Sequence, residues 1–246
     1  MWSLDKYEYG SSMNIVAIIQ ARLGSTRLPS KVKLDICGKP LLYHVIRRVK
    51  QAVEHVAVAY PTKDWRVLEN IVLDAGAFAF SYCGDENDLI DRHSLCAKYF
   101  DADVVIRVPG DNPCVDPDEI RRILQVYLEA KPFDLTTNLE QNTLGNGYPG
   151  GLGAEIYDAW FLHWMNEKVK HPMLREHPHL WAYANDTVQT IQAPEEIRRP
   201  HLRFDVNTKE DFEYIRWTYE ALPPNFRTKD ILNYLENTKN VKCSNG

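Results

Sequence analysis

Short apolar runs alternate with amphipathic stretches through the first half of the chain. Runs of strand character lie at 15–19, 56–60, 77–81 and 103–108, and helices are expected between them at about 40–51, 64–74 and 86–99. The run DVVIRV at 103–108 is almost continuously apolar, as strands buried on both faces of a sheet are. This alternation predicts an α/β fold, in which a mostly parallel sheet carries helices on both faces.

Polar residues at helix starts predict two further helices. Asp116 is placed to cap a helix that begins at Pro117, because acidic residues follow in its first turn. Thr208 and Asp211 have the spacing of a capping box at the start of TKEDFEYIRWTYEAL. A final helix is expected near 228–238.

The alternation of strands and helices breaks after about residue 132. FDLTTN, TVQTIQA and HLRFDV are expected to be strands, AEIYDAWFLHWM turns from strand to helix, and the glycine-rich QNTLGNGYPGGLG is expected to be a flexible loop. Trp160, Phe161 and Trp164 are expected to build packing contacts rather than a platform on which a ligand stacks.

Composition limits the classes of protein that fit this sequence. The chain of 246 residues has a formal net charge of −5, which argues against nucleic acid as a partner. It has no apolar stretch long enough to span a membrane, and the opening MWSLDKYEYGSS lacks the basic and apolar regions of a signal peptide. The five cysteines form no CxxC motif, so we expect reduced thiols in a cytoplasmic protein rather than a disulfide framework or a zinc site.

A cationic loop follows the first strand. Arg22, Arg27 and Lys31 surround a Gly-Ser-Thr run at 24–26, and small residues let backbone N–H groups approach an anion. The loop contains neither the P-loop pattern nor the dinucleotide fingerprint. It predicts a phosphate-type ligand. The alternative is a solvent-exposed loop whose arginines bind no ligand and only contribute to solubility.

A second candidate site follows the strand at 103–108. Gly110 and Asp111 come directly after it, and ligands of open α/β sheets bind beyond the carboxyl ends of the strands. A carboxylate there suits Mg²⁺ bound to phosphate oxygens. The alternative is an aspartate that only stabilises a turn.

The loop and later stretches of the chain share a pattern with a known family. They read IIQARLGSTRLPSKVK, ICGKPLLYHVIRRV, GDENDLIDR, DVVIRVPGDNPCVDP, REH and VNTKEDFEYI. Together, over roughly residues 13–220, they resemble the cytidylyltransferases that activate sugars. The sequence is similar to the 3-deoxy-manno-octulosonate and acylneuraminate cytidylyltransferases, and most of all to their spore coat polysaccharide biosynthesis branch.

The resemblance implies a Rossmann-like nucleotidyltransferase fold with a three-layer core. A small mixed lobe at about 133–200 would serve acceptor contacts or a homodimer. Residues 13–222 would form the nucleotidyltransferase domain, after an extension at 1–12 and before a C-terminal helix and tail at 223–246.

The resemblance also implies an activity. A Mg²⁺-dependent enzyme would transfer CMP from CTP to a sugar acid, a sugar phosphate or a related phosphorylated metabolite and release pyrophosphate, in surface polysaccharide biosynthesis. Lys31, Arg22 and Asp111 would be catalytic. The nucleotide would be bound by Ala21, Arg22, Gly24, Ser25, Thr26, Arg27, Lys31, Asp88 and Gly110. Asp88 and Arg92 match the family, and the alternative is that they pair with each other on one helix.

The sequence departs from the family at the expected metal and acceptor sites. The family usually reads V-D-T-P-E-D where this chain reads Val206-Asn207-Thr208-Lys209-Glu210-Asp211, so Asn207 stands in place of an aspartate. Asp205, two residues earlier on the same face of the expected strand, is the alternative second ligand of Mg²⁺ beside Asp111. In the acceptor region the family branch reads R-G-L-D-V-E and this chain reads Gly150-Gly151-Leu152-Gly153-Ala154-Glu155. The acceptor-binding candidates that remain are Glu155, Arg175, Glu176 and His177. Gly150 and Gly153 replace the arginine and the aspartate of the branch, which implies an acceptor different from that of close relatives, or a looser pocket.

Two other functions stay open at this point. A nucleotide-sugar-dependent glycosyltransferase would place a D-x-D motif at the end of the central strand, but Asp101 and Asp103 precede that strand and Asp116 and Asp118 open the next helix. A nucleotide-binding protein without turnover is suggested by the departures from the family at Asn207 and Gly153.

Overall fold

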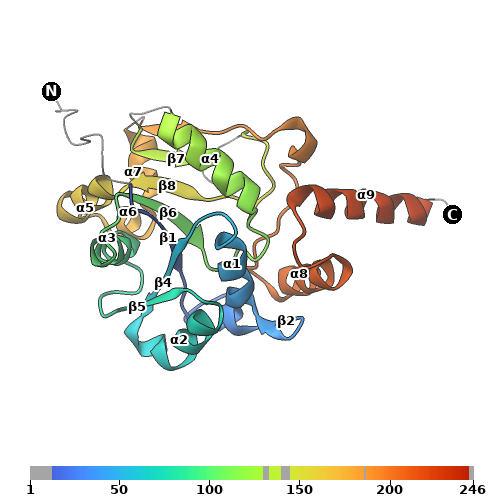
Figure 1. Cartoon of the computed structure of the whole chain (residues 1–246), viewed down its shortest axis with the longest axis horizontal. Helices are drawn as coiled ribbons and strands as arrows, with labels where there is room; N and C mark the ends of the chain where they lie inside the picture. The colour runs from blue at the N-terminus through green and yellow to red at the C-terminus, as the bar shows by residue number, and fades with distance from the viewer. Residues whose placement is uncertain (1–12, 130–132, 140–144, 186, 244–246) are drawn as a thin grey trace.

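A seven-stranded sheet forms the centre of the molecule. The computed structural model describes residues 13–129, 133–139, 145–185 and 187–243, so the predicted extension at 1–12 and the residues after 243 lie outside the described chain. The sheet has the order β5-β4-β1-β6-β8-β7-β9 and lies between two layers of helices (Figure 1). The predicted α/β architecture is confirmed.

The first half of the chain builds the parallel part of the sheet. Four strands run parallel to one another: β1 (Ile15–Gln20), β4 (His55–Pro61), β5 (Phe78–Tyr82) and β6 (Val104–Pro109). β1 lies between β4 and β6, and its residues from Val16 to Ile19 are buried. The carboxyl ends of β1 and β6 therefore lie side by side at one edge of the sheet.

The second half of the chain continues the same sheet. β8 (Glu155–Asp158) is antiparallel to β6, β7 (Leu135–Thr137) is antiparallel to β8, and β9 (Val188–Thr190) is parallel to β7. The strands of the segment 133–200 thus extend the central sheet. The role of that segment in acceptor or dimer contacts stays a prediction.

Each face of the sheet has its own hydrophobic core. Ala17 and Ile19 of β1 face one core, and Val16 and Ile18 face the other, because successive side chains of a strand point to opposite sides. The first core is covered by α1 (Leu41–Val49), α2 (Trp65–Asp74), α4 (Pro117–Glu129), α8 (Lys209–Ala221) and the start of α9 (Thr228–Cys243). The second is covered by α3 (Leu89–Tyr99), α5 (Ala159–Lys168) and α7 (His179–Ala184), with α6 (Pro172–Glu176) beside α3 and α7.

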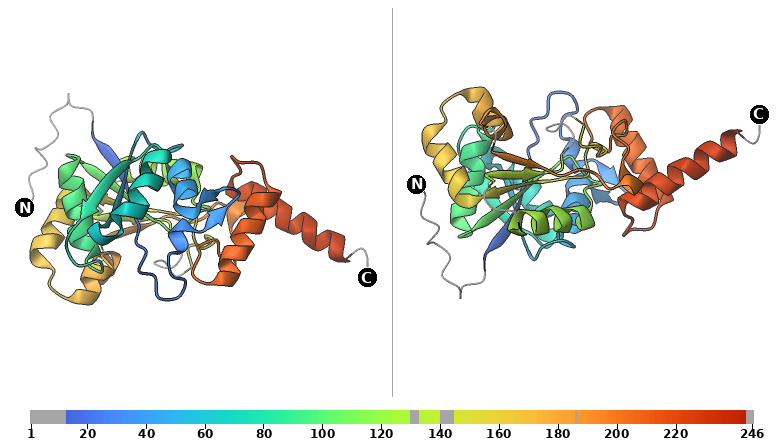
Figure 2. Two further views of the ribbon diagram at one scale, coloured as in Figure 1. Left: turned by 90° about the horizontal axis from the view of Figure 1, so that it is seen from below. Right: turned by 90° about the horizontal axis from the view of Figure 1, so that it is seen from above.

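The predicted helix caps are present. The Asp116 carboxylate accepts the backbone N–H of Asp118 at 2.9 Å, and Thr208 and Asp211 form a reciprocal capping box on α8. Asp116 also accepts hydrogen bonds from the backbone N–H and hydroxyl of Thr228, which ties the start of α9 to the start of α4. α9 projects from the body of the molecule (Figure 2).

Several sequence-based predictions are wrong in detail. HLRFDV is not a strand: only an isolated bridge joins Gly150 to Arg203. The helix expected from residue 86 begins at Leu89, and a short hairpin of β2 (Asp35–Ile36) and β3 (Lys39–Pro40) precedes α1.

The glycine-rich stretch and the aromatic cluster also differ from expectation. Residues 146–153 are irregular, as a loop is, but they are buried; residues 141–144 lie outside the described chain. Phe161 is buried in the second core and Trp164 packs against it, whereas Trp160 is 46 % exposed and does not build the core. No helix in the described part of the chain is long and apolar enough to cross a membrane.

Candidate active site

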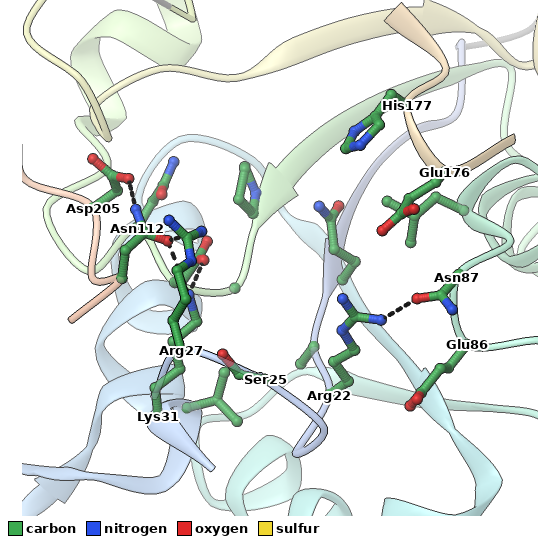
Figure 3. A pocket seen from close by; sticks show the side chains of 18 of the residues that line it. Arg22, Ser25, Arg27, Lys31, Glu86, Asn87, Asn112, Glu176, His177 and Asp205 are labelled. Carbon is green, nitrogen blue, oxygen red and sulfur yellow. Dashed lines mark hydrogen bonds and ion pairs between the residues drawn. The ribbon is translucent and has the colours of Figure 1, made fainter. Parts of the chain in front are cut away.

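A cavity of about 550 Å³ opens at the carboxyl ends of β1 and β6. Its walls come from the loop after β1, the start of α3, the loop after β6, the end of α6 and the segment before α8 (Figure 3). Among its lining residues are most of the predicted site residues: Ala21, Arg22, Ser25, Thr26, Arg27, Lys31, Gly110, Asp111, Glu176, His177, Asp205 and Asn207. The topology thus brings together groups that are far apart in the sequence.

Backbone contacts fix the loop after β1. The N–H of Leu23 donates to Asp64 Oδ2 at 2.9 Å, and the N–H groups of Ser25 and Ser30 both donate to the carbonyl of Leu23. Ser30 has a left-handed φ of 57° and precedes the short helix η1 (Lys31–Lys33). This turn directs the Lys31 side chain into the cavity, whereas Gly24, also predicted to bind nucleotide, is exposed and does not line it.

Lys31 joins three segments of the chain. Its ammonium forms an ion pair with Asp111 and donates to the carbonyl of Val206 at 2.6 Å. Asn207 Oδ1 lies 3.4 Å from the same nitrogen. Since Lys31 is only 8 % exposed, these oxygens replace the water that a surface lysine would bind.

Glycine is required at position 110 because β1 passes close by. The N–H of Gly110 donates to the carbonyl of Gln20 at 3.0 Å. A Cβ atom on Gly110 would lie 2.5 Å from that carbonyl oxygen, which is too close for any side chain. The close approach sets the position of Asp111 at the end of β6.

The polar side chains near Lys31 are hydrogen-bonded to one another. Asn207 Oδ1 accepts a hydrogen bond from Arg27 at 2.7 Å, and the Asn207 amide nitrogen donates to Asp205. Arg203 binds both oxygens of Asp205, at 3.1 and 2.8 Å. Asp205 and Asn207 lie in irregular chain rather than on the expected strand, but both line the cavity, as Asp111 does.

The donor chemistry of these three residues fits Mg²⁺ better than a zinc ion. Two carboxylates and one amide oxygen are hard ligands, which Mg²⁺ prefers. Within the described residues, no group of three or more His, Cys, Asp or Glu side chains is arranged to hold a metal. A cation here would therefore depend on phosphate oxygens and water for much of its coordination.

The opposite side of the cavity is formed by the start of α3. Arg22 donates to Asn87 Oδ1 at 2.5 Å (Figure 3). Asp88 caps α3 and forms an ion pair with Arg175 at 2.6 Å. Asp88 does not pair with Arg92, and neither Asp88 nor Arg175 lines the cavity. This pair joins α3 to α6, and a direct contact of either residue with a ligand stays a prediction.

Glu155 lies behind the cavity wall rather than in it. Its side chain is fully buried and forms an ion pair with Arg107, which does line the cavity. It also accepts a hydrogen bond from the Tyr157 hydroxyl at 2.8 Å, and His179 Nδ1 lies 3.4 Å away. Burial alone would raise the pKa of Glu155, but Arg107 and its other partners hold that pKa below the ordinary value. Glu155 is therefore a carboxylate that orients Arg107.

Two D-x-D pairs lie away from this site. Asp103, at the amino end of β6, accepts the backbone N–H of Asn14 at 2.8 Å. Asp116 and Asp118 serve the starts of α4 and α9. Neither pair lines the cavity, so the arrangement of a D-x-D glycosyltransferase is absent from it.

Comparisons with known proteins agree with this geometry. A model of the family described as Cytidylyltransferase matches residues 16–237. This chain belongs to the cytidylyltransferase family. It is therefore a nucleotidyltransferase, and the sequence resemblance stated above is confirmed.

Two related proteins align with different fractions of this chain. The spore coat polysaccharide biosynthesis protein SpsF of Bacillus subtilis is 30 % identical over 215 residues, which cover 84 % of this chain and 87 % of that protein. The 3-deoxy-manno-octulosonate cytidylyltransferase of Trichlorobacter lovleyi is 36 % identical over 116 residues, 47 % of this chain and 46 % of that protein.

Solved structures of cytidylyltransferases share the fold. A cytidylyltransferase from Leptospira borgpetersenii superposes with a TM-score of 0.84 at 25 % identity, over 94 % of this chain and 97 % of that one. A CMP:2-keto-3-deoxy-manno-octonic acid synthetase complexed with CTP superposes with a TM-score of 0.66 at 22 % identity, over 85 % of this chain and the whole of that one.

The cavity of this cytidylyltransferase also contains residues outside the predicted set of ligands. They are Gln20, Arg92, Arg107, Asn112, His179 and Arg203. Two of them have a signal in the sequence: Arg92 belongs to a segment that matches the family, and Arg107 is a charged residue near the end of a buried strand, close to Asp111. No pattern pointed to Gln20, Asn112, His179 or Arg203 as ligands.

Proposed function

We propose that the protein is a Mg²⁺-dependent cytidylyltransferase that transfers CMP from CTP to a small acceptor and releases pyrophosphate. The observation that carries this proposal is the junction of Lys31, Asp111 and Asn207 in a cavity at the carboxyl ends of β1 and β6. The Lys31 ammonium and the side-chain oxygens of Asp111 and Asn207 lie at the edge where α/β sheets commonly bind small molecules. The family membership and the CTP bound to a structural relative support the choice of nucleotide.

The loop after β1 is the proposed triphosphate site. Arg22, Arg27 and Lys31 line the cavity beside the small side chains of Ser25 and Thr26. Arginine and lysine donate charge-assisted hydrogen bonds to phosphate oxygens, and the three cations would offset most of the charge of a triphosphate. Arg27 is already held toward the cavity by Asn207.

Lys31 is the proposed stabiliser of charge on the reacting phosphates. Its ammonium forms an ion pair with Asp111. Phosphate oxygens compete for the same ammonium, so nucleotide binding would draw Lys31 toward the triphosphate and free the Asp111 carboxylate. Asp111, with Asn207 and Asp205, would then hold Mg²⁺, which supplies positive charge that stabilises the phosphate oxygens. The residues of the chain contribute positioning and fixed charge, which are the main needs of phosphoryl chemistry.

The acceptor would enter from the side of α6 and α7. Glu176 and His177 line that side, and Figure 3 shows both facing the cavity across from Asp205 and Lys31. An acceptor hydroxyl or phosphate oxygen bound there would face the α-phosphorus of CTP, and its attack would expel pyrophosphate. A role in making a surface polysaccharide is suggested by the likeness to the spore coat protein.

Release of pyrophosphate tests this activity directly. Purified protein is incubated with CTP, Mg²⁺ and a panel of sugar acids and sugar phosphates, and an enzyme-coupled assay measures pyrophosphate. We expect release that needs one class of acceptor and is abolished in Asp111→Asn. Sugar transfer from a nucleotide sugar without pyrophosphate release, or nucleotide binding with no release for any acceptor, would contradict the proposal.

A further inference from the structure

The short helix α6 brings two residues into the cavity wall but has little packing of its own. Glu176 at its end and His177 directly after it line the cavity (Figure 3). In the described structure α6 has five residues and none of their side chains is buried, although Leu174 packs partly against the second core. A helix of this length does not persist in water by itself. Contacts with other elements must therefore fix α6 and the two cavity residues.

Arg175 supplies such contacts with every nitrogen of its guanidinium group. Nε donates to Asp88 Oδ2 at 2.6 Å, and Nη2 donates to Asn166 Oδ1 at 2.6 Å. Nη1 donates to the carbonyls of Val169 at 2.7 Å and Asn166 at 3.2 Å. The side chain of Arg175 is 17 % exposed, so water competes little with these charge-assisted hydrogen bonds. Arg175 thus joins α6 to the start of α3 and to the end of α5.

The partners of Arg175 are themselves held by other residues. Asp88 uses its second carboxylate oxygen to accept the N–H of Asp91 at 3.0 Å, which caps α3. The amide nitrogen of Asn166 donates to Asp91 at 2.8 Å, and Asp91 also accepts the hydroxyl of Tyr82 at 2.7 Å. The guanidinium group therefore binds a connected polar network rather than isolated surface side chains.

The same network reaches the nucleotide side of the cavity. Asn87 and Leu89, the chain neighbours of Asp88, both line the cavity. Arg22 of the loop after β1 donates to Asn87 at 2.5 Å. A ligand that rests on this start of α3 would also fix the Asp88 carboxylate, and with it the ion pair to Arg175. Hydrogen bonds and adjacent residues thus connect the nucleotide side to α6.

We propose that Arg175 is a positioning residue that makes the acceptor side of the cavity respond to the nucleotide. It fixes α6, so Glu176 and His177 keep their places in the wall while the start of α3 is held. In the described chain Arg175 does not line the cavity, so it acts through α6 rather than by touching a ligand. This inference rests on the proposed function for the identity of the nucleotide.

Amide hydrogen exchange of α6 tests the coupling, with CTP and Mg²⁺ as the probe. A peptide covering residues 171–178 reports the hydrogen-bonded N–H groups of Leu174, Arg175 and His177. In the wild type we expect CTP with Mg²⁺ to slow this exchange by about threefold or more, because a ligand stabilises the arrangement to which it binds. Isothermal titration calorimetry measures the Kd of CTP separately.

Variants at both ends of the ion pair separate the coupling from nucleotide binding. Arg175→Gln should speed the exchange of α6 by about tenfold and abolish its response to CTP, while the Kd of CTP stays within about threefold. Asp88→Asn should act in the same direction, since asparagine still caps α3 but brings no charge to Arg175. Because the two residues act through one contact, the double variant should add little to Arg175→Gln.

Arg227 provides the matched control. It forms an ion pair with Asp118 at 3.1 Å and donates to the carbonyl of Asn225 at 2.9 Å, as Arg175 does with its own carboxylate and carbonyl partners. In the described structure it lies outside the cavity lining. Arg227→Gln should therefore leave both the exchange of α6 and its response to CTP unchanged. Circular dichroism melting checks that each variant is folded.

Three outcomes would overturn the coupling. Exchange of α6 in Arg175→Gln at the wild-type rate would show that other contacts fix the helix. Equal slowing by CTP in Arg175→Gln and the wild type would assign the protection to direct contact with the nucleotide. CTP binding that leaves α6 unchanged in the wild type would reject the coupling and leave the proposed function standing. A protein that binds no CTP would instead refute the proposed function, and the coupling with it.

Discussion

Lys31 and Asp111 are 80 positions apart in the chain and form an ion pair at the end of the central sheet. One residue belongs to the proposed triphosphate loop and the other to the proposed metal site. Their contact means that the two sites are not independent: a ligand that draws Lys31 away also exposes Asp111. We therefore expect nucleotide and Mg²⁺ to bind cooperatively.

The Lys31→Ala substitution should impair catalysis while leaving the fold intact. In Lys31→Ala we expect kcat to fall by about two orders of magnitude or more, because a charge that stabilises the phosphates is lost. Lys33→Ala is the control, since Lys33 lies in the same short helix η1 but is exposed. Pyrophosphate release under saturating CTP measures both. Equal turnover in Lys31→Ala and the wild type would exclude the catalytic role.

The amide at position 207 should limit the affinity for Mg²⁺. An amide oxygen brings no charge, so Asn207→Asp should lower the Mg²⁺ concentration for half-maximal CTP binding by roughly tenfold. Asn207→Ala should raise it instead, because that variant also loses the contacts with Arg27 and Asp205. Titration of Mg²⁺ at fixed CTP gives both values. The same Mg²⁺ dependence in all three proteins would place the metal elsewhere.

The close approach at Gly110 should tolerate no side chain. Gly110→Ala would put a Cβ 2.5 Å from the carbonyl oxygen of Gln20, and we expect a loss of about 1–3 kcal/mol in the free energy of unfolding. In Gly24→Ala the nearest atom is the flexible Glu86 carboxylate at 3.2 Å, so that change should cost less. Urea denaturation compares the two variants. A Gly110→Ala protein as stable as the wild type would refute the steric argument.

The buried His93 should make stability fall in acid. Its pKa is lowered to about 3 in the folded protein by burial and by Arg107, against about 6.5 in the unfolded chain. The unfolded chain therefore binds more protons between these values, so the stabilisation is complete above pH 6.5 and decreases as the pH falls. His93 contributes about 2 kcal/mol to the loss between pH 6.5 and 5.

A variant comparison isolates this titration from that of the carboxyl groups. Urea denaturation at pH 7, 6 and 5 should give a shallower pH dependence for His93→Gln than for the wild type. His55→Gln should keep the wild-type slope, because His55 is exposed. Identical slopes for His93→Gln and the wild type would show that the His93 titration makes no contribution.

Local patterns predicted the parallel core and the helix caps because both depend on residues close in the sequence. β1, β4 and β6 are short apolar runs, and the Thr208 cap needs only Asp211 three residues later. The family resemblance was also visible locally, in the loop between Ala21 and Lys31. These features required no knowledge of how the strands are ordered.

Features that depend on distant partners were missed. HLRFDV alternates like a strand and buries Phe204 and Val206, yet its backbone bonds to Gly150 and Asp111, which belong to no neighbouring strand. The β2–β3 hairpin was missed for a different, local reason: its turn uses positive φ angles at Cys37 and Gly38, and a cysteine at such a position is an unusual turn signal.

The acceptor side of the site was the least predictable from sequence. Glu155 has the residue type of a ligand contact, but the antiparallel pairing of β8 with β6 buries it opposite Arg107. Arg107, near the end of β6, therefore lines the cavity, and Glu155 lies behind it. The pairing of Arg107 with Glu155 follows from the register of the two strands, which the sequence alone does not give.

Equilibrium binding of CTP, UTP, ATP and GTP in the presence of Mg²⁺ tests the central claim most directly. The measurement uses the wild type and Lys31→Ala, with Lys33→Ala as the control. We predict selective binding of CTP that weakens strongly in Lys31→Ala and stays unchanged in Lys33→Ala. Failure to bind any of the four triphosphates, or CTP affinity that is independent of Lys31, would contradict the assignment of this cavity as a CTP site.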